Sequence, residues 1–204
     1  MSATHRTYPA LESPWGARFF AKANNISSFQ TLVAKFVEFQ ASLSDSGTWA
    51  GYSYLSFTSI TATYFLPNAS TEALSAFDAI ATFAEMHADE MSLNLSIQAF
   101  PSFQAWRKYV YRCAEAGASC TDRTGDYVVL ASRLLPKDLL QSDGGAEVAA
   151  AFVEILGTGV DTIIGHLVAG RAVAKTEVDN AVNPAWRTAL WHVIVVDNAV
   201  NPAW

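Results

Sequence analysis

Two histidines near the C-terminal end, His166 and His192, are the side chains whose type best suits acid–base chemistry. Each has an aliphatic residue two positions away on both sides, which is typical of a strand face. Each histidine is then either a neutral side chain that forms a hydrogen bond within a sheet layer, or a polar group that points into a ligand pocket. The sequence leaves both interpretations open, and it assigns no catalytic residue.

Three tyrosines add hydroxyl groups to the candidates. Tyr52, Tyr54 and Tyr64 lie in two aromatic and β-branched segments, residues 49–57 and 59–66, which are close enough to pair as a hairpin. Because a buried tyrosine hydroxyl needs a hydrogen-bond partner, each ring either packs in the core or reaches a pocket.

Residues 91–100 form the clearest predicted strand, and its polar side chains share one face. Apolar and polar residues alternate there, so one face is buried and the other is polar. The polar face consists of Ser92, Asn94, Ser96 and Gln98.

Several chemistries find no support in the sequence. The four histidines and two cysteines have no metal-ligand spacing, and neither a G-x-G-x-x-G nor a G-x-S-x-G motif occurs. A net charge of −6 without a basic run speaks against nucleic acid. No apolar run is long enough for a membrane span, and the N-terminus lacks a signal core. As written, the chain is expected to be soluble and cytoplasmic.

The pattern of elements predicts an α+β fold. Helices are expected at residues 27–43, 70–87, 101–110 and 147–156, with Ser27 and Ser28 as caps of the first. Further strands are expected at residues 127–134, 161–174 and 188–195. Paired strands mixed with single helices favour an antiparallel sheet with helices packed on one face.

The chain ends on a repeat of nine residues. Residues 178–186 recur letter for letter as residues 196–204, which predicts a domain of residues 1–195 and a duplicated tail of residues 196–204. Cys113 and Cys120 are either a disulfide across a turn or two ordinary thiols.

Several short segments resemble the berberine bridge enzyme-like FAD-linked oxidases of the vanillyl-alcohol oxidase type. These segments are residues 4–9, 64–68, 132–136 and 183–187, the last leading into an apolar strand. The resemblance implies the substrate-binding domain of that family, in which one sheet face closes over the flavin ring and a small alcohol, sugar or secondary metabolite. It makes Tyr52, Tyr54, Asn94, Gln98, His166 and His192 the substrate-binding candidates.

The resemblance also implies departures from the family pattern. The sequence shows neither the glycine-rich pyrophosphate loops of the family's flavin domain nor its covalent His and Cys attachment points. The chain alone is therefore expected to retain no FAD, to be inactive, and to self-associate through its exposed sheet face. Members of the family are often secreted. The alternative is a flavin-independent small-ligand binding or cyclase-type domain that self-associates.

Overall fold

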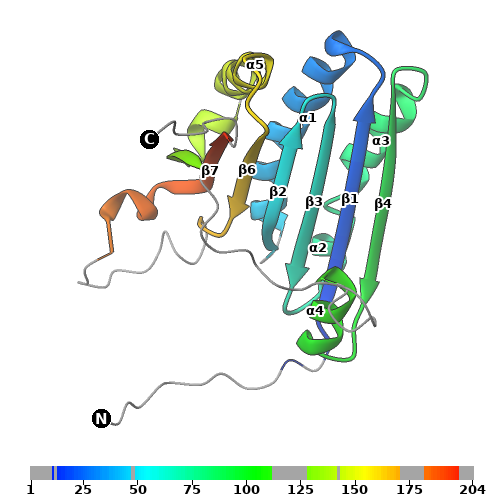
Figure 1. Ribbon diagram of the computed structural model, residues 1–204. Coiled ribbons are helices and arrows are strands. Elements are labelled where there is room, and N and C mark those ends of the chain that lie inside the picture. Colours follow the sequence, from blue (N-terminus) through cyan, green and yellow to red (C-terminus); the bar gives the residue numbers. More distant parts are fainter. Residues whose placement is uncertain are drawn as a thin grey trace.

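The computed structural model describes residue 11 and residues 13–46, 49–111, 128–141, 143–170 and 182–197. Seven antiparallel strands form one sheet in the order β4-β1-β3-β2-β6-β7-β5 (Figure 1). The strands are β1 (Trp15–Ala23), β2 (Ala50–Ser56), β3 (Ser59–Leu66), β4 (Met91–Ala99), β5 (Val129–Pro136), β6 (Thr162–Leu167) and β7 (Ala189–Asp197). The predicted α+β class is confirmed.

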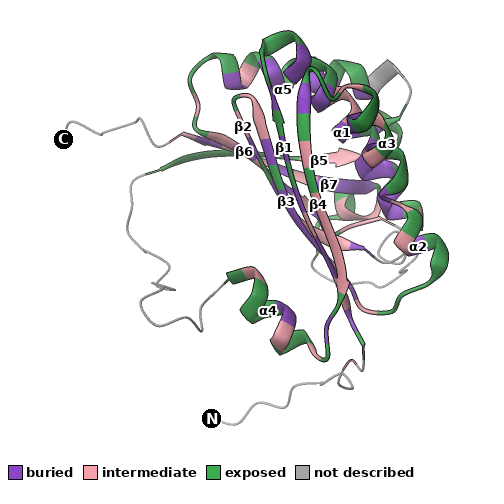
Figure 2. Cartoon of the chain, turned by 90° about the vertical axis from the view of Figure 1, so that its right-hand side faces the viewer, coloured by how far each residue is buried: buried purple, intermediate pink, exposed green. Residues whose placement is uncertain are grey.

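The helices lie on both sides of the sheet, but unequally. They are α1 (Ile26–Ser46), α2 (Thr71–Ser75), α3 (Asp78–Met86), α4 (Phe103–Tyr111) and α5 (Asp143–Gly157), with short 3-10 turns η1 (Asp138–Leu140) and η2 (Pro184–Arg187). Helices α1, α2, α3 and α5 form the layer that covers one face (Figure 2). Helix α4 lies on the opposite side, near one end of β1, β3 and β4 (Figures 1 and 2). Among the described helices, none has the length and apolar character that a membrane crossing requires.

The core lies between the sheet and α1. Phe36 of α1 contacts Phe19 of β1 and Trp191 of β7, with ring centroids 5.4 and 6.2 Å apart. Trp191 is fully buried, and Gly165 of β6 makes room for it, because a Cβ there would lie 2.3 Å from the indole ring. The glycine is thus required for close packing under the sheet.

Strand β1 is a central strand that the sequence analysis missed. It pairs with β3 on one side and with β4 on the other. Its core-facing residues, Ala17, Phe19, Ala21 and Ala23, alternate with residues that point to the other face. Three of the four are alanines, which are depleted in strands, so the period-two pattern was weak.

Other element bounds also differ from the prediction. The N-cap of α1 is Asn25, whose Oδ1 accepts a hydrogen bond from the Ser28 amide at 3.0 Å, so the prediction of Ser27 or Ser28 as cap was wrong. The helix expected at residues 70–87 is divided into α2 and α3. Strand β6 ends at Leu167, before the expected end at residue 174.

The end of β7 bears on the predicted tail. The strand continues to Asp197, two residues past the expected boundary at residue 195. Val196 is only 9% exposed and pairs with Leu130 of β5 and Thr162 of β6. The first residues of the second repeat copy therefore belong to the sheet. Residues 4–9, Cys113, Cys120 and residues 198–204 lie outside the described residues.

Candidate ligand-binding face

The candidate site is the sheet face opposite the helix layer of α1, α2, α3 and α5, called the open face below. Side chains alternate between the two faces of a strand, so the residues between the core residues point to this side. The strand register places six polar side chains in one line across the sheet. This polar row consists of Ser96, Arg18, Thr63, Tyr52, His166 and His192. It crosses five strand spacings, about 24 Å.

All six predicted substrate-binding residues lie on the open face, and the register brings three of them into the polar row. Tyr52, His166 and His192 are direct neighbours on β2, β6 and β7. Tyr54 lies in the next row, beside Ile164 of β6. The structure thus groups four of the candidates at one part of the face.

Asn94 and Gln98 lie apart from that group. Both are on β4, and β1 and β3 separate them from β2. Asn94 pairs with Phe20 and Gln98 with Gly16. Tyr64 belongs to the core instead, where its hydroxyl bonds with Gln40 at 3.0 and 3.2 Å.

The tyrosines of the open face carry protonated hydroxyls. Tyr52 donates a hydrogen bond to the Tyr111 hydroxyl of α4 at 2.8 Å. Burial and this hydrogen bond raise the pKa of Tyr52 well above its usual value, and burial followed by the neighbouring Tyr111 raises the pKa of Tyr54. At neutral pH both groups are therefore hydrogen-bonding alcohols and not phenolates.

The two histidines form a contact pair at the β6–β7 end of the row. Their ring centroids are 5.5 Å apart, and the Trp186 ring lies 5.6 Å from His192. Burial, and then the neighbouring His192, lower the pKa of His166. A neutral imidazole has one nitrogen that accepts a proton, so His166 can act as a base near neutral pH.

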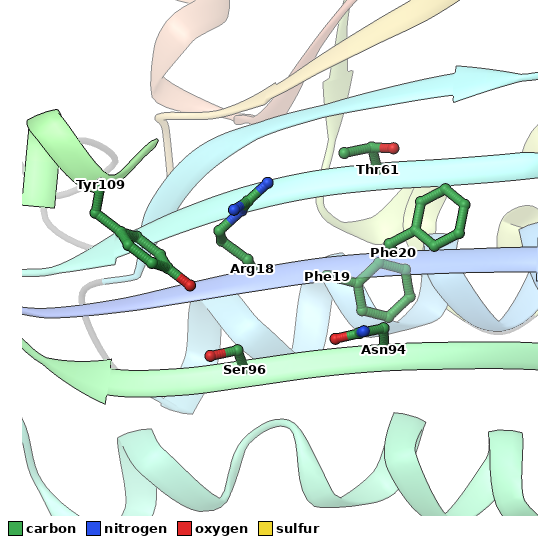
Figure 3. Close-up of a pocket in the computed structure, with 7 residues that line it drawn as sticks. All are labelled: Arg18, Phe19, Phe20, Thr61, Asn94, Ser96 and Tyr109. Carbon is green, nitrogen blue, oxygen red and sulfur yellow. The ribbon is translucent and has the colours of Figure 1, made fainter. Parts of the chain in front are cut away.

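The other end of the row opens into a hollow of about 310 Å³. It is lined by Arg18, Phe19, Phe20, Thr61, Asn94, Ser96 and Tyr109 (Figure 3). The Tyr109 side chain descends from α4, and the guanidinium carbon of Arg18 lies 5.5 Å from the centre of its ring. This distance is within the range of cation–π contacts.

Helix α4 is held on the open face by an aromatic cluster. Trp106 is only 8% exposed, and its ring lies 4.8 Å from that of Phe65 on β3, with Phe103 5.3 Å from Phe65. Gly16 of β1 provides the space, because a Cβ there would lie 2.4 Å from the indole. This contact positions Tyr109 and Tyr111 over the sheet.

Sequence reasoning missed several residues of this face, and for identifiable reasons. Arg18, Phe20 and Thr61 could have been found only once β1 was recognised beside β3. Tyr109 lies in the helix predicted at residues 101–110 and Tyr111 directly follows it, but nothing in the sequence indicated that this helix packs on the opposite side from the others.

No group of His, Cys, Asp or Glu side chains able to hold a metal ion occurs within the described ranges. The glycines of the central strands do not open a cradle for a phosphate either. The Cβ positions of Gly16 and Gly165 are filled by the indole rings of Trp106 and Trp191. The described face therefore offers aromatic rings, hydroxyls, imidazoles and a guanidinium, but no backbone anion nest.

Comparison with known proteins agrees with the fold and the resemblance. An uncharacterized FAD-linked oxidoreductase of Arthroderma benhamiae is 32% identical over 214 residues, which cover 95% of this chain and 34% of the relative. The VAO-type flavoprotein MtVAO713 of Myceliophthora thermophila superposes with a TM-score of 0.73 at 18% identity, covering 92% of this chain and 35% of that one.

A glucooligosaccharide oxidase of Acremonium strictum superposes with a TM-score of 0.60 at 12% identity, covering 96% of this chain and 42% of that one. No protein-family model matches the sequence. The chain thus spans about a third of the length of the relative it matches in sequence.

Proposed function

Since this chain is a relative of the berberine bridge enzyme-like FAD-linked oxidases and spans about a third of their length, we propose that it is the substrate-binding portion of such an oxidoreductase. Its substrate is a small alcohol, sugar or secondary metabolite. The chain is inactive by itself, because hydride transfer belongs to the flavin and the flavin needs a second domain to hold its pyrophosphate.

The observation that carries the proposal is the polar row. Six polar side chains from six strands align on the face that the main helix layer leaves uncovered. Exposed polar residues on a sheet are ordinary, but here the Tyr52 ring contacts that of Tyr54, and the two histidine rings contact each other. The His192 ring also contacts that of Trp186. Pockets for small molecules combine apolar walls with a few convergent polar groups in this way.

The residues present fit one part of FAD and not another. The aromatic and hydroxyl groups of the open face suit a flat ring that lies over the sheet, with Tyr52, Tyr54 and His166 as its nearest candidates. The central strands that the structure describes offer no place for the pyrophosphate, because tryptophan rings fill the space beside Gly16 and Gly165. When bound, FAD supplies the acceptor for the hydride.

The chain's own side chains then bind the substrate and accept its proton. The Tyr52 hydroxyl, which donates its proton to Tyr111 at 2.8 Å, keeps an oxygen lone pair that accepts a hydrogen bond from a substrate hydroxyl. His166 is the proton acceptor, since burial and His192 lower its pKa and keep the imidazole neutral. Trp186 limits the access of water to His192.

An NMR titration of the ¹⁵N-labelled chain with riboflavin tests this proposal, because riboflavin has the flavin ring without the pyrophosphate. We expect shifts confined to the open face, including the amides of Tyr52 and His166, and we expect His166→Gln to weaken them. His87→Gln is the matched control, since His87 follows α3 on the helix side. Shifts on the helix layer alone would contradict the assignment of the face.

The flavin content of the purified chain tests the second part of the proposal. Denaturing release of flavin should give a flavin-to-protein ratio far below one. A ratio near one would show that the chain holds the whole cofactor, and the pyrophosphate argument would then be wrong.

The alternative function, a flavin-independent ligand-binding or cyclase-type domain that self-associates, is favoured by one observation. Phe20 and Tyr54 are 44% and 42% exposed on the open face, where a second copy could cover them. Light scattering across a concentration series, with Phe20→Ser as the disrupting variant, distinguishes this function. A dimer that dissociates in the Phe20→Ser variant, but does not dissociate when riboflavin is added, would favour the alternative.

A further inference from the structure

We propose that the hollow beside Arg18 binds a carboxylate, and that the substrate of the open face is therefore an acid that carries a single ring. This inference rests on the proposed function, because it names the substrate class of the same face. It starts from Arg18, which lines the hollow beside Tyr109 (Figure 3), and none of the described residues that line this hollow is a carboxylate.

The guanidinium of Arg18 is oriented but not neutralised. Among the described residues, its side chain forms neither an ion pair nor a hydrogen bond. It forms a cation–π contact with the Tyr109 ring, whose centre lies 5.5 Å from the guanidinium carbon. A contact with an aromatic ring, unlike an ion pair, does not use the N–H groups of a guanidinium as hydrogen-bond donors to an anion. Those N–H groups match the two oxygens of a carboxylate.

The charges of the chain are sorted between the two sides of the sheet. In a chain of net charge −6, the described strands contain a single carboxylate, Asp197 at the end of β7. The open face carries Arg18 and Lys22, and α4 adds Arg107 and Lys108 without an acidic residue.

The helix layer carries a net negative charge, with Lys35 of α1 as the one basic residue of its described helices. Its acidic residues include Glu38, Asp45, Glu72, Asp78, Glu85, Glu147 and Glu154. A face lined by one sign of charge concentrates ligands of the other sign. The open face therefore attracts anions although the chain as a whole is acidic.

The walls of the hollow indicate the rest of the ligand. Phe20 and Tyr109 provide aromatic surface for a ring, while Thr61, Asn94 and Ser96 provide hydrogen-bonding groups. Its volume of about 310 Å³ is at the small end of ligand pockets, which suits one ring.

The strand spacing sets how far such a ligand reaches. Arg18 and Tyr52 are two strands apart in the polar row, about 9–10 Å. A single-ring acid held at Arg18 therefore extends toward the Tyr52 and Tyr111 hydroxyls. His166 lies a further strand away and is reached by a substituent on the far side of that ring.

The test compares each acid with its neutral analogue on the labelled chain. The probe pairs are glucuronate with glucose and benzoate with benzyl alcohol, and inorganic phosphate serves as a ringless anion. NMR shifts of the Arg18 and Ser96 signals report binding in the hollow. We expect each acid to bind about tenfold or more tightly than its neutral analogue, and added salt to reduce the difference.

Two variants on the same strand form the matched pair. Arg18→Gln should weaken binding of the acids by about tenfold or more and leave the neutral analogues unchanged. Lys22→Gln removes a charge four residues further along β1, outside the hollow, and should have little effect. Retained circular dichroism shows that both variants are folded.

The outcomes separate this inference from the proposed function. Neutral analogues that bind as well as acids, or acids that are indifferent to Arg18→Gln, would overturn the carboxylate site while leaving the open face as the substrate surface. Phosphate that binds as tightly as the ring-bearing acids would overturn the ring requirement and indicate a general anion site. An absence of shifts with every probe and with riboflavin would contradict both proposals.

Discussion

Replacing Gly16 with alanine should release α4 from the open face. The added Cβ would lie 2.4 and 2.6 Å from two atoms of the Trp106 indole and 3.0 Å from the Phe100 ring, so the rings must move. Inserting a methyl group into a packed site costs about 1–3 kcal/mol. Undocking the helix loses a similar amount, because burial of one large apolar side chain contributes about 1.5–3 kcal/mol. We therefore expect α4 to lift off before the sheet distorts.

The assay follows from the sequence of α4 itself. Arg107 and Lys108 are trypsin sites in the middle of the helix. Limited proteolysis at these sites, and amide hydrogen exchange of α4, should both accelerate in the Gly16→Ala variant by roughly tenfold for each 1.4 kcal/mol of docking free energy lost. Exchange of the sheet amides should change little.

Gly157→Ala is the matched control, because nothing lies within 4 Å of the position that its Cβ would take. Gly157 is the last residue of α5, where alanine favours the helix by up to about 1 kcal/mol. If Gly16→Ala leaves proteolysis and exchange of α4 unchanged, the Trp106 ring moves without cost. The view that Gly16 holds the helix in place would then be refuted.

Three other predictions concern the core, the histidines and the tail. Tyr64→Phe should destabilise the fold by about 1–3 kcal/mol in urea unfolding, because it leaves the buried Gln40 amide short of a partner. Burial and a neighbouring histidine lower the pKa of His166 below its usual 6.5, so the unfolded chain binds the proton more readily and stability should fall as pH drops from 6.5 toward the folded pKa. An NMR titration of the imidazole that gave a raised pKa would contradict this. Deleting residues 198–204 should change the free energy of unfolding by less than about 1 kcal/mol, whereas deleting residues 196–204 should cost about 1.5–3 kcal/mol more, since it removes a buried valine from β7. Equal losses from the two deletions would show that the valine contributes nothing.

The strands with a strong alternation of apolar and polar residues could be predicted, and those with a weak one could not. The period-two pattern predicted a strand at residues 91–100, and β4 covers Met91–Ala99. The aromatic segments predicted the β2–β3 hairpin. Strand β1 buries mainly alanines and was missed. The break between α2 and α3 contains neither glycine nor proline. The N-cap residue of α3, Phe77, forms no side-chain hydrogen bond, so the sequence carried no signal for the break.

The side chains that share the open face could be predicted better than their grouping. Alternation along a strand shows which residues share a face, and this was enough to select Tyr52, His166 and His192. It does not show which strands are neighbours. The pairing of β2 with β6 places Tyr52 beside His166, far along the chain, and only the folded register contains that information. Arg18 was missed because its strand was missed.

The charge of the open face also bears on what covers it. In a symmetric dimer built face to face, Arg18 and Lys22 of one copy would lie opposite a surface of the same sign. Like charges that lose their water repel each other, so such a dimer is opposed at low salt and favoured as salt screens the repulsion. Binding of a partner domain with an acidic surface, or of an acid that carries a ring, depends on salt in the opposite way: it is favoured at low salt and weakened as salt screens the attraction. Because Arg18 and Lys22 flank the exposed Phe20 ring on β1, a second copy cannot cover that ring without burying them. The balance of charge thus favours an anionic ligand under a second domain over a second copy of this chain.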